Sequence, residues 1–298
     1  MTRTLRPVGL PLVCALLALA AEPAQTVHVS FEPGDLFVSL EPGPVQWYLS
    51  DGTLRQVLLS TVPGTGEGMG FDPSGNLYVT RWCTDPGCTS TGNTVEMFNV
   101  LGQSLGAVGK GYDCSPHDIV FKPDWTAYVG QAGCTGDVLR FTPGTVDPDA
   151  FDVAPEHQGS FWIDMAADGC TLFYTSMGRN VKRFDTCTGA QLADFNAAPL
   201  PGGVTHDLRV LPDGGVLVSS GEVIARLDAA GALVQTYAAA AGEPALWAGL
   251  DLAGDGTFWA ANYYSSNIHK FDLASGARLQ RFNTNTPPNT AVGVAVMR

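Results

Sequence analysis

Two histidines of the sequence stand in the same context and are the residues best suited to chemistry. His117 and His206 are each followed directly by Asp, and each lies four residues before the end of an apolar segment. Glu67 occupies the same place before another apolar segment. Imidazole nitrogens and carboxylate oxygens are common protein ligands of divalent metals. If the segments converge, the pattern predicts a metal site for Mg²⁺, Ca²⁺ or Zn²⁺, with the two histidines as candidate catalytic residues.

The His-Asp pairs also have a purely structural interpretation. An imidazole and a carboxylate at the start of a strand can hydrogen-bond to neighbouring loop backbone, and a repeat protein can copy that contact between repeats. The residue types alone leave both roles open. We expect no part in a site for the other three histidines, because His28 lies near the N-terminus, His157 in a connecting loop and His269 in an outer strand.

The apolar segments that carry these residues belong to a repeat that extends through the chain. The last apolar residue of each inner segment recurs every 42 to 50 residues. This column consists of Phe71, Phe121, Met165, Val210, Leu252 and Val296. Four residues later most repeats place Gly, which suits a tight turn with φ > 0; Trp125 stands there in one repeat, and we expect a different turn. A period of this length is typical of β-propellers.

The two ends of the chain supply complementary parts of one repeat. Segment 291–297 is a first strand with no strands after it, whereas the N-terminal region has three strand-like segments without a first strand. Joining them closes a ring that has no long open edge. We therefore predict an all-β, six-bladed β-propeller with four-stranded antiparallel blades, closed by the C-terminal strand in the N-terminal blade. Using residues 26–31 as the missing strand would leave the C-terminal strand unpaired.

Propellers conventionally bind ligands around the central channel, at the face where first strands begin and second strands end. On this face the first strands begin with Glu67, His117, Phe161, His206, Ala248 and Val292. Residues after the second strands, together with an aromatic group in the last repeat, are the predicted ligand-binding residues: Arg81, Gln131, Ser176, Ser220, Asn262, Trp247, Tyr263 and Tyr264. The aromatic side chains have an equally good alternative role in packing loops.

One charged group occupies equivalent positions in three consecutive repeats. Asp164, Arg209 and Asp251 each lie one residue before the end of a first strand, so Arg209 is expected between two carboxylates. These charged side chains either form the base of a ligand site, where they interact electrostatically with the ligand, or are buried where blades meet and neutralise one another.

Residues 1–24 have the features of a secretory signal peptide. Arg3 and Arg6 precede an apolar run at residues 8–21 that is too short for a comfortable membrane span. Residues 25–298 are then expected to form one propeller domain. The net charge is −13 at pH 7, and removing the two arginines makes the mature chain more acidic. The mature chain is therefore a poor candidate for binding an anionic membrane, and we expect no nucleic-acid partner.

The cysteines favour an oxidising compartment, so we expect a secreted or periplasmic protein. Removing Cys14 with the signal peptide leaves an even number, and the repeat places the remaining residues in pairs that share one face of the propeller. The predicted disulfides are Cys83–Cys88, Cys114–Cys134 and Cys170–Cys187. There is no CxxC motif, which argues against a thiolate zinc site.

The repeat 249–272 resembles those of NHL and streptogramin-lyase-like (virginiamycin B lyase-like) propellers, and segment 78–80 is similar to YVTN-type repeats. The resemblance covers essentially the whole mature chain, and the gluconolactonase-like group shares its six-bladed plan. In the lyases Trp-Phe-Thr-Glu recurs at the end of second strands, whereas segment 259–262 lacks the Glu. Only His206 has a context comparable to the lyases' catalytic set, and Glu41 aligns loosely with the metal-binding Glu of gluconolactonases.

Two functions remain open. There is no GxSxG elbow, P-loop, GxGxxG, HExxH or CxxCH motif. The first hypothesis is an exported, monomeric binding module that takes a small molecule, an extracellular protein or a glycan at the channel face. The alternative is a metal-dependent lyase or lactonase of the streptogramin lyase or gluconolactonase-like type, which uses His117, His206 and Glu67.

Overall fold

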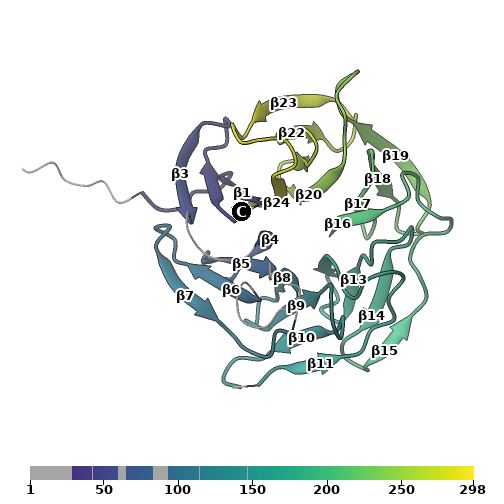
Figure 1. The fold of residues 1–298 in the computed structure, drawn as a ribbon. Coiled ribbons are helices and arrows are strands. Elements are labelled where there is room, and N and C mark those ends of the chain that lie inside the picture. The colour runs from purple at the N-terminus through teal and green to yellow at the C-terminus, as the bar shows by residue number, and fades with distance from the viewer. Residues whose placement is uncertain (1–28, 42, 60–64, 83–92, 114, 146) are drawn as a thin grey trace, which may run out of the picture.

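The chain folds into a ring of β-sheets around a central channel. The structure is a computed structural model that describes residues 29–41, 43–59, 65–82, 93–113, 115–145 and 147–298. In these ranges, 24 strands form six four-stranded antiparallel sheets (Figure 1). This confirms the predicted six-bladed β-propeller. The predicted signal peptide lies outside the described residues, and none of the described segments is a helix with the length and hydrophobicity that a membrane crossing requires.

Each blade runs outward from an inner strand at the channel. Blade 1 contains β24 (Ala291–Val296), β1 (Leu36–Leu40), β2 (Val45–Tyr48) and β3 (Leu54–Leu59). Blade 2 contains β4 (Thr65–Phe71), β5 (Leu77–Trp82), β6 (Thr94–Phe98) and β7 (Ser104–Val108). Blade 3 contains β8 (Pro116–Phe121), β9 (Ala127–Gln131), β10 (Val138–Phe141) and β11 (Asp149–Phe151). Blade 4 contains β12 (Ile163–Met165), β13 (Thr171–Tyr174), β14 (Lys182–Asp185) and β15 (Ala190–Leu192). Blade 5 contains β16 (Thr205–Val210), β17 (Val216–Ser220), β18 (Val223–Leu227) and β19 (Leu233–Ala238). Blade 6 contains β20 (Trp247–Leu252), β21 (Thr257–Asn262), β22 (Asn267–Asp272) and β23 (Arg278–Asn283).

The C-terminal strand closes the ring as predicted. β24 pairs antiparallel with β1, with Leu36 opposite Val296 and Val38 opposite Val294. Figure 1 shows the yellow end of the chain beside the purple first strand. All six residues of β24 are buried, so blade 1 needs this strand to cover its inner edge.

The expectation of a different turn at Trp125 was wrong. Trp125 has φ of 69°, close to the value of 82° at Gly75 in the equivalent turn. Its amide also donates to the carbonyl three residues earlier, at Lys122, as the Gly75 amide does to Asp72. The blade therefore imposes the turn conformation on a side chain that disfavours it, at a cost of about 1–2 kcal/mol.

Apolar side chains fill the space between neighbouring blades. One cluster, which includes Phe37, Trp47, Phe98 and Met69, joins blades 1 and 2. Near the channel the inner strands approach so closely that glycine is required: a Cβ on Gly68 would lie 2.2 Å from the Asp118 carboxylate of the next blade. This tight packing fixes where each inner strand begins.

The structure contains the expected Cys170–Cys187 disulfide, which links the first turn of blade 4 to the turn after its third strand. Cys134 is also disulfide-bonded. Its expected partner Cys114 and the pair Cys83–Cys88 lie outside the described residues.

Candidate ligand-binding site

The six residues that the repeat aligns near the start of the inner strands meet in one cavity. They come from all six blades and line a space of about 620 Å³ at one mouth of the channel. The members of this ring are Glu67, His117, Phe161, His206, Ala248 and Val292. Counting along the repeat thus placed every member of the ring at the same cavity.

β-bulges turn the ring residues toward the channel. In five sheets the pairing of the inner strand shifts register at the ring position, for example between Pro116 and Asp118 in β8 and between Thr205 and Leu208 in β16. A bulge leaves a residue unpaired and changes the direction of its side chain. This repeated irregularity therefore places His117 and His206 at the cavity.

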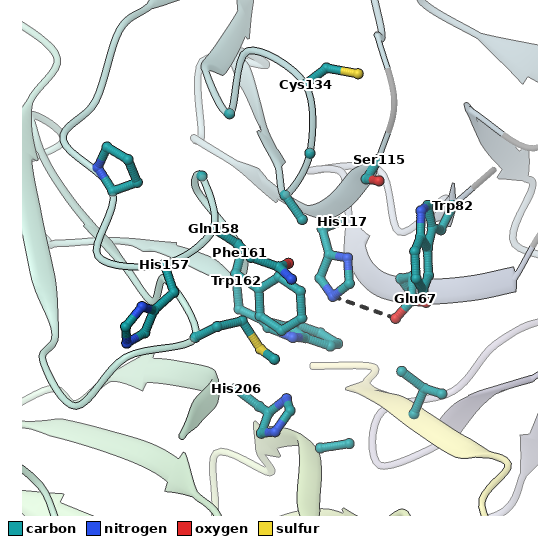
Figure 2. Close-up of a pocket in the computed structure, with 18 of the residues that line it drawn as sticks. Glu67, Trp82, Ser115, His117, Cys134, His157, Gln158, Phe161, Trp162 and His206 are labelled. Atoms are coloured by element: carbon teal, nitrogen blue, oxygen red, sulfur yellow. Dashed lines mark ion pairs between the residues drawn. The ribbon is translucent and has the colours of Figure 1, made fainter. Parts of the chain in front are cut away.

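His117 is buried against aromatic rings and lacks a normal hydrogen bond. Its ring stacks on Phe161 with 3.8 Å between centroids and meets Trp162 edge-on at 5.4 Å. Its Nε2 lies 3.5 Å from Oε2 of Glu67 (Figure 2), too far for a good hydrogen bond, and among the described residues neither ring nitrogen has a hydrogen-bond partner. Burial and the nearby His206 lower the pKa of His117 to about 3, so the imidazole is neutral at pH 7.

Two carboxyl groups lie on the wall of the cavity. Burial, assisted by the Glu41 charge, raises the pKa of Glu67 well above its usual value. Glu41 follows β1 and accepts a hydrogen bond of 2.7 Å at Oε2 from the hydroxyl of Tyr263. Burial therefore disfavours the ionised form of Glu67, whereas Glu41 is anchored in position by a phenol.

The three predicted metal ligands do not form a shared ligand set. Phe161 stacks on His117, and its centroid lies 5.9 Å from that of the His206 ring. Burial lowers the pKa of His206 to about 4. Among the described residues, the one group with three closely spaced donor atoms is Cys170, Asp185 and Cys187, whose cysteines are disulfide-bonded. Glu67, His117 and His206 share a cavity, but their three donor atoms do not lie close together in this arrangement, and the metal site stays a prediction.

The expectation that His157 lies outside the site was wrong. The loop that precedes β12 folds over the cavity, where His157 and Gln158 join its lining together with Trp82 and Met177. The His157 and Gln158 amides both donate to the carbonyl of Ser176, at 3.0 and 3.2 Å. This loop follows no repeat position, so the periodic pattern gave no signal for it.

The predicted residues at the ends of second strands do not line the cavity. They are buried and bind the backbone of nearby loops. Arg81 donates to Gly43 (3.1 Å), Gln131 accepts from the Asp113 amide (3.0 Å), Ser176 accepts from the Glu156 amide (2.7 Å), Ser220 donates to Pro201, and Asn262 donates to Pro244 (2.9 Å). These side chains shape the cavity by fixing its loops.

The three predicted aromatic ligands occupy different environments. Tyr263 lines the cavity. Trp247 is fully buried in the core between blades 5 and 6, where its indole N–H donates to the Glu222 carbonyl at 3.1 Å. Tyr264 is 45% exposed and is not part of the lining. Of these three residues, only Tyr263 is positioned to contact a ligand in this cavity.

The aspartates of the His-Asp pairs join blades rather than face the cavity. Four inner strands carry an Asp whose Oδ2 accepts an N–H from the inner strand of the next blade. The pairs are Asp118 with Ile163 (3.2 Å), Asp164 with Val210 (2.7 Å), Asp207 with Leu250 (2.7 Å) and Asp251 with Val296 (2.8 Å). In each His-Asp pair, therefore, the Asp joins two blades, which is a structural role, whereas the His lines the cavity.

Arg209 lies among these carboxylates. Its guanidinium contacts Asp207 at 2.5 Å and Asp251 at 3.0 Å, and lies 3.8 Å from Asp118. These neighbours raise its pKa against the opposing effect of burial. Asp164, the second expected partner, accepts the Val210 amide instead. Arg209, Asp164 and Asp251 also border a separate cavity of about 710 Å³ at the other mouth of the channel.

Comparisons with known proteins show the fold and no family. No protein-family model and no curated protein matches the sequence. Solved propellers match its structure. A chain in a nidogen/laminin complex has a TM-score of 0.72 at 11% identity, covering 89% of this chain and 98% of that one. Virginiamycin B lyase from Staphylococcus aureus has a TM-score of 0.57 at 13% identity, and the match covers 77% of this chain and 73% of that one. A Bacteroides caccae protein of unknown function has a TM-score of 0.66 at 13% identity, and the match covers 90% of this chain and 100% of that one.

Proposed function

We propose that the protein is a binding module that takes a small organic molecule into the channel-face cavity. The observation that carries this proposal is the buried His117 imidazole, which has no hydrogen-bond partner among the described residues. A buried polar group without a partner costs about 1–3 kcal/mol, which a ligand that hydrogen-bonds to it recovers. The cavity volume of about 620 Å³ is in the range of small-molecule sites.

The proposal also places the protein outside the cytoplasm, secreted or in a periplasm, as a monomer. It is supported by the signal-like sequence of residues 1–24. The disulfide between Cys170 and Cys187 supports an oxidising compartment.

The contact between Glu67 and His117 favours a second candidate function, a lyase or lactone hydrolase. A carboxyl whose ionised form is disfavoured by burial and an imidazole that is neutral at pH 7, with 3.5 Å between Oε2 and Nε2, are a candidate general acid and a candidate general base. A binding module returns its ligand unchanged, whereas an enzyme converts it, so analysis of recovered ligand separates the two.

Filling the cavity should abolish binding. Ala248 belongs to the ring and is nearly buried, so Ala248→Trp places an indole in the space that a ligand needs. We expect the fluorescence of the neutral probe N-phenyl-1-naphthylamine to rise when the unaltered protein is added. The affinity for the probe, taken from the fluorescence titration, should be at least about tenfold weaker in Ala248→Trp. A tenfold change in affinity corresponds to about 1.4 kcal/mol.

Ala230→Trp adds the same side chain at an exposed turn and is the matched control. Thermal unfolding of both variants verifies that they fold, and Val292→Phe offers a second way to fill the cavity. Equal fluorescence from unaltered protein and Ala248→Trp would show that the probe binds elsewhere and would contradict the proposal.

A further inference from the structure

The cavity has a distinct charge character. Among the described residues that line it, two are acids, Glu41 and Glu67, three are histidines, and none is Lys or Arg. The pKa values of His117 and His206 are lowered to about 3 and about 4, so neither ring supplies positive charge at pH 7. The lining can therefore attract a cation and offers no charged partner to an anion.

Aromatic rings form much of the remaining wall. Trp82, Phe161, Trp162 and Tyr263 all line the cavity. Figure 2 shows Trp82 beside Glu67, with Phe161 and Trp162 near His117. The faces of such rings attract organic cations, and aromatic walls combined with carboxylates suit ammonium groups that carry alkyl substituents. A small, strongly hydrated metal ion would gain little from these walls.

No Lys or Arg among the described residues lines the cavity beside Glu41 and Glu67, so a cationic ligand would supply the positive charge there. Glu41 is held by the Tyr263 hydroxyl at 2.7 Å. Burial raises the pKa of Glu67, and the charge of Glu41 raises it further. A cation between them would favour ionisation of Glu67. The unpartnered imidazole of His117 remains available for a hydroxyl or N–H of the same molecule.

On the basis of the proposed binding function, we propose that the cavity selects an organic ammonium ion that carries an apolar part and a hydroxyl or N–H group. Glu41 and Glu67 supply the negative charge, the aromatic residues enclose the alkyl groups, and His117 accepts the polar hydrogen.

Three molecules of the same shape test the selection. Choline is the cation, 3,3-dimethylbutan-1-ol is its neutral isostere and 3,3-dimethylbutanoate is an anionic isostere. Affinities come from ligand-observed saturation-transfer NMR, which detects weak binding. We expect choline to bind at least about tenfold more tightly than the alcohol, and the anion to give no signal.

Glu67→Gln tests the source of the preference. Gln has the shape of the protonated carboxyl but cannot ionise, so the variant is expected to fold normally and to lose about tenfold in affinity for choline while the alcohol is unaffected. Glu222→Gln removes an exposed acid outside the lining and is the matched control, expected to change neither affinity. Thermal unfolding verifies the fold of both variants.

The outcomes separate this inference from the proposed function. If the alcohol binds as tightly as choline, or if none of the three binds while N-phenyl-1-naphthylamine does, the ammonium proposal is wrong and the binding cavity stands. If Glu67→Gln leaves the preference for choline unchanged, the assignment to the carboxyls is wrong. If neither the three molecules nor the naphthylamine binds, both proposals fail.

Discussion

Replacing Arg209 by Leu is expected to lower the free energy of unfolding by about 3–5 kcal/mol. Arg209 is nearly buried and contacts Asp207 and Asp251, with Asp118 close by. Removing one partner of a buried ion pair leaves charge that is neither paired nor hydrated, and this is the costly half of such contacts. Burial already raises the pKa of Asp118 to about 7 with Arg209 present. Urea unfolding followed by circular dichroism measures the loss.

The control for this variant is Arg226→Leu. Arg226 also pairs with an aspartate, Asp213 at 3.2 Å, but that carboxylate is largely exposed to solvent. Exposed pairs contribute about 0–1 kcal/mol, so the control should remain close to the unaltered protein. Equal effects of the two substitutions would mean that the aspartates around Arg209 do not depend on it, and that the inner strands are held together by the backbone alone.

Trp247→Ala is expected to destabilise the protein by about 3–5 kcal/mol, because it empties a large space in the core. Trp247 is fully buried among Tyr237, Leu250, Phe258 and Phe271, between blades 5 and 6. It does not line the cavity, so the folded fraction of the variant should still bind N-phenyl-1-naphthylamine. Unfolding in urea and probe fluorescence measure the two effects.

Trp82→Ala should show the opposite behaviour. Trp82 is 42% exposed and lines the cavity, so its loss should cost little stability and weaken binding. If Trp247→Ala loses binding at full stability, Trp247 contacts the ligand after all, and the position of the site is wrong.

The repeat made most of the fold predictable. Inner strands, turns and closure follow from apolar columns because each blade must bury the same faces against its neighbours. The same argument located the ring around the cavity, since equivalent positions on equivalent strands meet at the channel. Trp125 shows where prediction from residue type fails. The Trp side chain disfavours the turn conformation, yet the packing of the whole blade imposes it.

The chemistry of polar side chains was less predictable. Gln131 and Ser176 looked like ligand contacts because they end second strands at the correct face, but buried polar groups usually find backbone partners nearby, and these do. His157 was missed for the converse reason, since its loop has no counterpart in other blades. The metal hypothesis for His117 and His206 stays a prediction, and it did not consider Phe161, the ring residue of the intervening blade, which contacts both imidazoles.

The most direct test of the central claim, that the channel-face cavity binds small molecules, is a crystal structure of the purified protein soaked with small aromatic and aliphatic amines and alcohols. We expect bound fragments to gather between Glu67 and Phe161, with a polar atom within hydrogen-bond distance of a His117 ring nitrogen. Fragments found only at other surfaces, with this cavity holding nothing but water, would contradict the account.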